Sequence, residues 1–506
     1  MYAVGIDSGT QGTKVLIIDF KGKVLGRGSA PHRFIENLKQ QPGASEQAPQ
    51  MWLAAFRKAL AQALMSSQIE PEKIVSFGVS GQQHGLVALD KNGDPIRPAK
   101  LWNDTSTIKE NELIIKKLGG PQQFIKKLGL NLAVGYTASK ILWLKRNEAE
   151  NYKKLKTVLL PHNYLNYYLS GKIHMEYGDA SGTGLMDIRK RQWSREAMAA
   201  IDPELEAKFP PLSHPSSAVG YLQKKIADQY GLKKVLVASG GGDNMMAAIG
   251  TGNVRPGICT LSLGTSGTIY SYFANPFIDP QGEIASFCDS TGGWLPLLCT
   301  MNVTNTTEGL KALLKISNKQ LEELASQAPV GADKLVFLPF LDGERVPVLP
   351  QAKAVLFGLD RKNFKPSSLA RAFMEGPILN LNYGFQRMKT LGLRPTEIRA
   401  TGGGAKSRLW LQIVADIFQT PVVIPEEKEG AAFGAALQSI WNFYLAQGQK
   451  TKIEELTSEM VKLSRRPIEP NPKSFPIYVQ LQQRLNSLWQ TLKQEFTAHQ
   501  QSNIKD

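Results

Sequence analysis

The chain has 506 residues, of which 42% are hydrophobic and 21% charged, a balance typical of globular proteins and unlike that of disordered ones. At roughly 100–200 residues per domain, this length predicts two to four domains. The formal net charge of +16 favours anionic ligands, but the basic residues lie in separate segments without interleaved aromatics, so we expect a solvated surface and no nucleic-acid partner.

An alternation of strands and turns, followed by a helix, opens the chain. Apolar runs bounded by glycine-rich turns indicate the strands, and apolar residues at helical spacing indicate the helix. In chain order the predicted elements are strand 2–7, turn 7–13 (DSGTQGT), strand 14–20, strand 23–32, helix 49–67 and strand 73–81.

The same pattern begins again in the second half of the chain. The segment 260–272 (TLSLGTSGTIYSY) repeats the strand, turn and strand of 5–17 (GIDSGTQGTKVLI), with the two Gly-Thr pairs in register. Later, 397–407 (EIRATGGGAKS) repeats the strand and small turn of 73–83 (KIVSFGVSGQQ). Such an internal duplication predicts two related α/β halves with a cleft between them.

The boundary between these halves is expected near residues 250–257 (GTGNVRPG). We therefore assign residues 1–253 to an N-terminal domain and 254–445 to a C-terminal domain. Residues 446–506 form a tail, in which a proline-rich linker (RRPIEPNPKSFP) leads into a predicted surface helix.

Cysteine usage and the first residues bear on the cellular compartment. The three cysteines, Cys259, Cys288 and Cys299, lack the paired spacing of a disulfide framework or a zinc site. The start, MYAVGIDSGT, lacks the basic and then apolar regions of a signal peptide. No apolar run reaches the roughly 18 residues that a membrane span needs. We expect a cytoplasmic protein with no membrane partner.

Both Gly-Thr turns have the composition of phosphate-binding loops. Glycines let backbone N–H groups point at a phosphate, and threonine hydroxyls add donors. In the first loop, Asp7 offers the carboxylate that Mg²⁺ prefers, and Lys14 offers a point charge for phosphate oxygens. Each turn alone favours the interpretation as a tight hairpin, but two copies in register favour phosphate binding. Neither turn matches GxxxxGK[ST] or GxGxxG.

A carboxylate, Asp243, follows the three glycines at 240–242 and leads into the apolar run 245–249. Two interpretations stand on these residues alone. Asp243 is a favoured helix N-cap residue. Alternatively, it is a functional carboxylate that the glycines allow a ligand to approach.

Seven motifs, in this order, resemble the FGGY carbohydrate kinases, a family within the actin-like ATPase (ribonuclease H-like) fold. SGQQHG together with WND is similar to the xylulokinase branch of that family. The resemblance implies two duplicated actin-like α/β domains and phosphorylation of a ketopentose, D-xylulose first, by ATP with Mg²⁺. The motifs are GIDSGTQGTK, SGQQHG, WND, GGGDN, LSLGTSG, FLPFLDGERVP and TGGGAKSRLWLQIVADIF.

The resemblance also implies roles for single residues. Asp243 would be the base that accepts the proton of the sugar hydroxyl as the γ-phosphoryl arrives. The residues implied for the sugar are Gln83, His84, Trp102, Asn103, Asp104 and Asn244. Those implied for the nucleotide are Asp7 as the Mg²⁺ ligand, with Thr10, Thr13, Lys14, Gly264, Thr265, Gly403, Gly404 and Ser407. Glu344 and Arg345 of the LDGERVP motif are expected to pair with each other in a structural role.

Departures from the family pattern leave the sugar open. Ser139, His162 and Asn163 differ from the residues of some relatives near the expected pocket. D-ribulose or another polyol is therefore an alternative substrate. A nucleotide-switched scaffold of the actin type is a second alternative, although a scaffold needs neither SGQQHG nor GGGDN. We expect a monomer or a homodimer.

Overall fold

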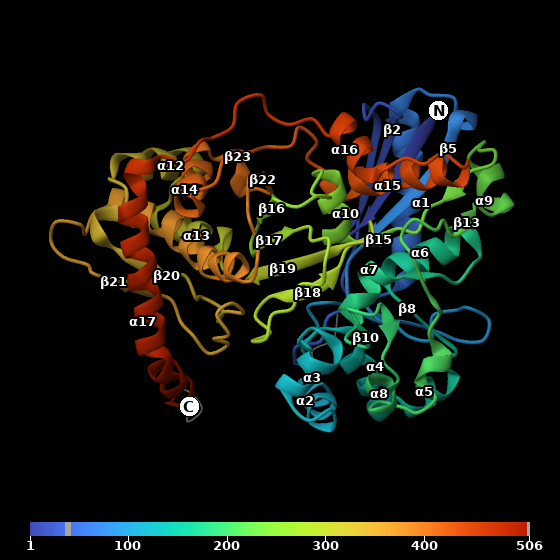
Figure 1. Cartoon of the computed structure of the whole chain (residues 1–506), viewed down its shortest axis with the longest axis horizontal. Helices are drawn as coiled ribbons and strands as arrows, with labels where there is room; N and C mark the ends of the chain where they lie inside the picture. Colours follow the sequence, from blue (N-terminus) through green and yellow to red (C-terminus); the bar gives the residue numbers. More distant parts are fainter. Residues whose placement is uncertain (36–41, 503–506) are drawn as a thin grey trace.

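The two halves of the chain are built on sheets of the same design, in a computed structural model that describes residues 1–35 and 42–502 (Figure 1). The first sheet has the strand order β13-β14-β5-β1-β2-β3, and β15 extends the pairing of β5. Its strands are β1 (Tyr2–Ser8), β2 (Gly12–Asp19), β3 (Val24–Pro31), β5 (Ile74–Gly81), β13 (Gly220–Tyr221), β14 (Leu236–Val237) and β15 (Gly241–Gly242).

The second sheet has the order β18-β19-β17-β16-β22-β23. In both sheets a strand pairs antiparallel with the next strand and parallel with a later one, as β1 does with β2 and β5, and β16 with β17 and β22. The predicted duplication is therefore confirmed. The strands of the second sheet are β16 (Ile258–Leu263), β17 (Gly267–Ser271), β18 (Ala285–Cys288), β19 (Trp294–Thr300), β22 (Glu397–Thr401) and β23 (Val422–Val423).

Two helices cover the first sheet. The predicted helix, α1 (Pro49–Ser67), packs on β2 and β3, and α15 (Gly430–Ala446) packs on β1 and β5. Because helices cover the sheet, the central residues of both strands, 3–6 of β1 and 15–18 of β2, are non-polar and buried.

Helix α15 belongs to the core of the first half although it is encoded near the end of the second. Figure 1 shows it beside the N-terminal strands. A Cβ at Gly5 would lie 1.8 Å from the carbonyl oxygen of Ala432, and one at Gly78 would lie 1.9 Å from that of Ala435. Only glycine permits this close approach of strand and helix. The division of the chain at 253/254 stays a prediction, and α15 packs with the first sheet.

Helix α10 (Asp243–Gly250) crosses α15 at a second glycine contact. A Cβ at Gly434 would lie 1.8 Å from the carbonyl oxygen of Met246, and one at Gly250 would lie 1.9 Å from that of Gly430. The backbones of the two helices therefore touch at two positions along α10, Met246 and Gly250.

The C-terminal tail helix, α17 (Phe475–Ser502), lies along the second half, at the far end from the N-terminus (Figure 1). It packs against α13 (Pro366–Thr390) and α14 (Arg408–Phe418). One face of it is buried in the second core, with Tyr478 2% and Leu485 0% exposed. The predicted tail helix is thus an integral part of that half.

The connection between β5 and β14 forms a largely helical layer next to the first sheet (Figure 1). No helix among residues 1–35 and 42–502 is both long and apolar enough to span a membrane. The helices of this layer are α2 (Ile108–Lys117), α3 (Pro121–Leu128), α4 (Thr137–Asn147), α5 (Ala149–Lys154), α6 (Pro161–Ser170), α7 (Tyr177–Ala180), α8 (Arg195–Ala199) and α9 (Lys224–Gln229). The remaining elements are β4 (Glu46–Gln47), β6 (Val87–Leu89), β7 (Ala99–Lys100), β8 (Thr157–Leu159), β9 (Met175–Glu176), β10 (Met186–Asp187), β11 (Gln192–Trp193), β12 (Leu212–Ser213), α11 (Thr304–Leu314), α12 (Asn318–Gln327), β20 (Val336–Leu338), β21 (Val355–Phe357) and α16 (Ile453–Met460).

Candidate active site

The ends of three parallel strands bring the candidate residues together. At the end of β5, Gly81 pairs with Ser8 of β1 on one side and with Gly242 of β15 on the other. The first Gly-Thr loop follows β1, the SGQQHG segment follows β5, and Asp243 follows β15. Ligand sites in α/β sheets are built at such carboxyl ends of strands.

Asp243 is the first residue of α10, and the N-cap position belongs to Gly242. The capping interpretation of Asp243 is therefore wrong. Its carboxylate accepts hydrogen bonds from the backbone N–H of Asn244 at 2.8 Å and from the side-chain Nδ2 of the same residue at 3.1 Å. The side chain is held at the helix N-terminus but keeps partial exposure to solvent.

Two carboxylates share this place. Burial raises the pKa of Asp243 to about 7, and the charges of Asp7 and Asp179 add to the shift. Burial also raises the pKa of Asp7 to about 6, although a hydrogen bond from Ser80 at 2.7 Å and the charge of Lys14 oppose the shift. The site is thus short of positive charge.

The donor set at Asp7 suits a magnesium ion. Asp7 is a partly exposed carboxylate whose pKa is raised by burial and, to a smaller extent, by the charge of Glu429, so it is a hard oxygen ligand that a bound cation would stabilise. No group of three or more His, Cys, Asp or Glu that could hold a metal occurs in the described part of the chain. Mg²⁺ at Asp7 would therefore take most of its ligands from phosphates and water, as it commonly does.

Each Gly-Thr loop is closed by a backbone hydrogen bond from its glycine, to the third residue on in the first loop and to the second residue on in the other. The N–H of Gly9 donates to the carbonyl of Gly12, and that of Gly264 donates to the carbonyl of Ser266, both at 3.1 Å. A Cβ at Gly9 would meet no atom closer than 3.8 Å, and one at Gly264 none closer than 3.4 Å. Thr265 is exposed. Both loops therefore have room for a phosphate beside their backbone.

The polar side chains of the first loop already have protein partners. The hydroxyl of Thr10 donates to Gln82 at 3.1 Å and accepts from the indole N–H of Trp102 at 2.9 Å. Thr13 is fully buried and its hydroxyl lies 2.9 Å from Nε2 of His32. Phosphate contacts by these threonines stay predictions, and each hydroxyl would first have to leave its present partner.

Lys14 forms an ion pair with Glu429, the residue before α15, at 2.6 Å. Both side chains are partly exposed, so the pair contributes little to stability and its ammonium can exchange partners. A phosphate contact by Lys14 therefore stays a prediction that this geometry allows.

On the predicted nucleoside side, only one of three residues faces open space. No atom lies within 4 Å of a Cβ added at Gly403. A Cβ at Gly404 would lie 2.8 Å from Cβ of Leu263, so this glycine is needed for packing. Ser407 is the N-cap of α14, where its Oγ accepts from the backbone N–H of Trp410 at 3.1 Å.

The surroundings of His84 keep its imidazole neutral and fix which ring nitrogen carries the proton. Its Nδ1 lies 2.8 Å from the carbonyl oxygen of Gly182, which can only accept, so Nδ1 carries the proton and Nε2 is a free acceptor. Burial, with the charges of Lys140 and Arg345, lowers the pKa of His84 to about 3. The ring stacks on Tyr136 with centroids 4.4 Å apart. Nε2 is therefore left for a ligand, and the sugar contact of His84 stays a prediction that this geometry allows.

Gln83 and Asn244 lie against each other beside Asp243. The Nδ2 of Asn244 donates to Oε1 of Gln83 at 2.8 Å. The Nε2 of Gln83 is buried without a hydrogen-bond partner, and so is Oδ1 of Asp179. An unpaired buried amide costs about 1–3 kcal/mol, which marks Gln83 as a donor that a ligand can satisfy.

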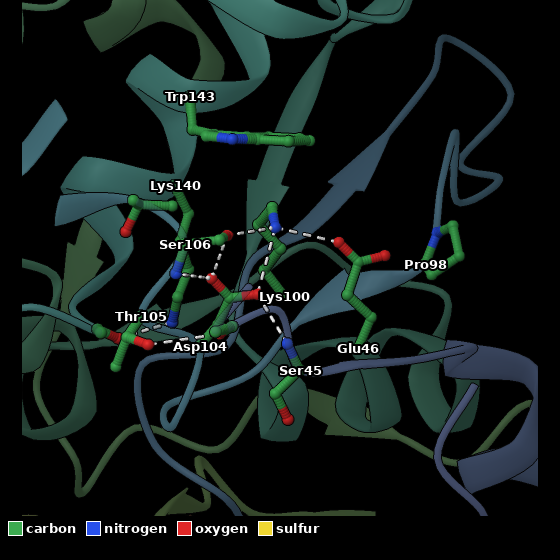
Figure 2. Close-up of polar contacts among 12 residues, drawn as sticks. Ser45, Glu46, Pro98, Lys100, Asp104, Thr105, Ser106, Lys140 and Trp143 are labelled. Carbon is green, nitrogen blue, oxygen red and sulfur yellow. Dashed lines mark hydrogen bonds and ion pairs between the residues drawn. The ribbon is translucent and has the colours of Figure 1, made fainter. Parts of the chain in front are cut away.

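Of the WND motif, Trp102 and Asn103 are partly or fully exposed, whereas Asp104 is 0% exposed. One carboxylate oxygen of Asp104 accepts from Lys100 Nζ at 3.1 Å and from the N–H of Ser45 at 2.9 Å. The other accepts twice from Ser106. Figure 2 shows this closed arrangement. Asp104 has no lone pair left for a sugar in this arrangement, so its sugar contact stays a prediction that one of these bonds would have to break to allow.

The side chains of Glu344 and Arg345 do not form the expected ion pair with each other, although the backbone N–H of Arg345 donates to the Glu344 carboxylate. Glu344 is 2% exposed and accepts from the backbone N–H of Met301 at 2.7 Å and from Nδ2 of Asn380 at 3.0 Å. The guanidinium of Arg345 points the other way, over the ring of Trp102 at 5.9 Å. A cation from the second half thus reaches the WND motif of the first.

Two residues that the sequence did not single out also shape the site. Gln47 donates to the carbonyl of Thr10 at 2.8 Å and accepts from Trp52 at 2.9 Å, which fixes the first loop. Lys140 donates to the carbonyl of His84 at 2.7 Å. The SEQAPQMW segment and the TASK sequence on α4 were the available signals, but nothing in them shows what they contact.

Comparisons with known proteins agree with this geometry. The model of the FGGY family of carbohydrate kinases, N-terminal domain, matches residues 2–250, and that of its C-terminal domain matches residues 261–443. The xylulose kinase of Haemophilus influenzae is 44% identical over 96% of this chain and 97% of its own, and that of Streptomyces coelicolor is 36% identical over 86% and 87%. A crystal structure of a xyloylose kinase from Brucella ovis, 30% identical, superposes with a TM-score of 0.90 over 97% of this chain and 99% of its own. The predicted fold class, two duplicated actin-like α/β domains, is confirmed, and the chain belongs to the FGGY family of carbohydrate kinases.

Proposed function

We propose that this enzyme transfers the γ-phosphoryl group of ATP to a hydroxyl of D-xylulose and releases D-xylulose 5-phosphate and ADP. The relatives named above as xylulose kinases support this substrate. The observation that carries the chemistry is Asp243, whose pKa burial raises to about 7. It lies beside Gln83 and Asn244, at the same strand ends as the phosphate-type loop at Gly9.

Asp243 acts as the general base. Its carboxylate takes the proton of the attacking hydroxyl as that oxygen bonds to the γ-phosphorus and the bond from phosphorus to the ADP oxygen breaks. A base is most effective when its pKa is near the working pH, which the raised pKa of Asp243 provides. Its place at the N-terminus of α10 also favours the negative charge that develops nearby.

The sugar would lie against the first half of the chain. The Nε2 of His84 accepts a hydrogen bond from one hydroxyl, and Nε2 of Gln83 donates to another. Asn244 holds a hydroxyl next to Asp243, and Asn103 is exposed at the rim. The ring of Trp102 offers an apolar face to the carbon skeleton.

ATP would lie across the two Gly-Thr loops. The backbones at Gly9, Gly264 and Thr265 face its phosphates, and Gly403 faces the nucleoside. Lys14 exchanges Glu429 for a phosphate oxygen. Asp7 would hold Mg²⁺, which neutralises phosphate charge in kinases of this kind.

A coupled assay of ADP release tests this function. D-xylulose, D-ribulose, aldopentoses, glycerol and gluconate are compared at equal concentration, and we expect the highest kcat/KM with D-xylulose. A higher kcat/KM with another sugar would overturn the substrate and keep the kinase. ADP release that no sugar stimulates would favour the scaffold alternative.

His84→Ala is expected to raise the KM for the sugar roughly two- to tenfold, because one hydrogen bond to a neutral hydroxyl is worth about 0.5–1.5 kcal/mol. The KM for ATP should change less than about twofold. Since the pKa of His84 is lowered to about 3, the imidazole stays neutral and the effect should be the same from pH 6 to 9. Steady-state kinetics with each substrate varied in turn measure both constants.

His214→Ala is the matched control, because the ring of this exposed histidine bonds to Ser216 in its own loop and packs edge-on against Tyr177, away from the proposed sugar contacts. It should leave both KM values unchanged. Equal rises of the two KM values in His84→Ala would make His84 a structural residue instead.

A further inference from the structure

Lys140 is a fully buried lysine at the back of the proposed sugar pocket. It lies on α4, is 0% exposed, and its Nζ donates to the carbonyl oxygens of His84 at 2.7 Å and Gly135 at 2.5 Å. Within residues 1–35 and 42–502 no carboxylate lies within ion-pair distance of it. Its hydrogen bonds go entirely to main-chain groups.

The neighbouring lysine shows what a purely structural charge looks like here. Lys100 is also 0% exposed, but it bonds Glu46, Asp104 and Ser106 and lies 3.9 Å from the ring of Trp143 (Figure 2). Its charge is compensated on all sides. Burying an ammonium without such a carboxylate costs several kcal/mol, and an apolar side chain would pack more cheaply. The contacts of Lys140 therefore need another explanation than packing.

The amine of Lys140 has enough N–H donors for the two carbonyls that it binds. Burial lowers its pKa to about 7. A neutral amine has two N–H bonds, as many as the carbonyls of His84 and Gly135. Both protonation states can therefore hold the two carbonyls.

Both carbonyls belong to segments with unusual backbone. His84 has a φ of 63°, in the left-handed region that costs a side-chain-bearing residue roughly 1–2 kcal/mol. Gly135 has a φ of 96°, and a Cβ on it would lie 2.2 Å from the carbonyl oxygen of Trp102. Such conformations persist only where the surroundings enforce them.

The two segments carry the walls of the pocket. Tyr136, next to Gly135, stacks on the ring of His84. Thr137 adds a second hydrogen bond to the carbonyl of His84, at 3.1 Å. The main chain at Gly135 abuts that at Trp102. Lys140 thus joins the segment that presents His84 to the segment that presents Tyr136 and adjoins Trp102.

We propose that Lys140 is a positioning residue for the sugar. By holding the carbonyls of His84 and Gly135 together, it fixes His84, Tyr136 and Trp102 as one preformed wall, so that Nε2 of His84 meets the sugar hydroxyl without reorganisation. This inference rests on the proposed function of the pocket. Lys140 contacts neither Gly-Thr loop, so it acts on the sugar and not on ATP.

Lys140→Met tests the proposal, because methionine keeps the length of the side chain and removes the donors. We expect the KM for the sugar to rise about tenfold or more, since hydrogen bonds from a charged or polarised donor are worth about 1.5–3 kcal/mol. The KM for ATP should stay within about twofold. Thr137→Val, which removes the other donor to the same carbonyl, should change the KM for the sugar in the same direction by a smaller factor.

Lys145→Met is the matched control. Lys145 lies on the same helix and donates to Asp202 at 2.7 Å and to the carbonyl of Ile201 at 3.2 Å, away from the pocket. The variant Lys145→Met also removes a lysine amine from α4, and both KM values should stay unchanged.

The outcomes separate this inference from the proposed function. Wild-type enzyme that turns over no sugar overturns both. Active wild-type enzyme overturns the positioning role alone if Lys140→Met keeps its KM for the sugar or raises both KM values equally. If Lys140→Met does not fold, Thr137→Val decides by the same criterion.

Discussion

Asp243→Asn is expected to lower kcat by about 10²–10⁴-fold, the usual contribution of a general base. The amide keeps the shape of the side chain and can still accept from the backbone N–H of Asn244, so α10 should form as before. Steady-state kinetics give the loss, and circular dichroism shows that the protein is folded. Asp228→Asn, at an exposed aspartate on α9, is the control and should keep full activity. A variant that retains most of its kcat would refute the assignment of Asp243.

The pH dependence of kcat/KM is a second test of the role of Asp243. Since the pKa of Asp243 is raised to about 7, kcat/KM should rise with pH through about 7 and then level off. The variant should lack this rise. The folded pKa lies above the ordinary value of 3.8, so the native protein holds a proton that the unfolded chain has released between these values. Asp243 therefore lowers the free energy of unfolding as pH rises through this window, and Asp243→Asn should raise the Tm of the ligand-free enzyme at pH 8.

Asp104→Asn should instead destabilise the protein, by about 3–5 kcal/mol, the cost of breaking a buried ion pair. The lower end of this range is expected because Glu46 stays within 3.0 Å of Lys100. Urea unfolding of the ligand-free protein measures the change. An aspartate that only bound sugar would leave the free energy of unfolding unchanged, and that result would favour the predicted sugar contact over a structural role.

Glu150→Gln is the control for the ion pair. Glu150 pairs with Lys153 at 2.7 Å, but the two side chains are 81% and 71% exposed. Exposed pairs are worth about 0–1 kcal/mol, so this variant should unfold at nearly the same urea concentration as the wild type.

The fold could be predicted from the sequence because the chain contains an internal repeat. The two Gly-Thr turns in register gave the duplication, and apolar runs gave β1, β2 and α1 at nearly their observed bounds. The position of α15 could not be predicted, because its apolar surface says that it is buried but not in which core.

Side-chain direction sets what the site residues can reach. Neighbouring residues of a strand point to opposite faces, so Thr13 and Lys14 of β2 point apart, and Lys14 is exposed whereas Thr13 is buried. The burial of Asp104 could not be predicted from the sequence, because Ser45 and Lys100 meet it only in the folded chain. The same holds for Arg345, whose ring partner Trp102 lies in the other half.

The position of α15 also bears on how the protein is made. Helix α15 packs against Gly5 and Gly78, and it can do so only after residue 446 has left the ribosome. At about 5–20 residues per second, the stretch from residue 250 to residue 446 takes roughly 10–40 s to synthesise. During this interval the apolar faces of β1 and β5 lack their cover, so the N-terminal half emerges first but completes its core late. We expect the two halves to reach the native state together rather than in the order of translation.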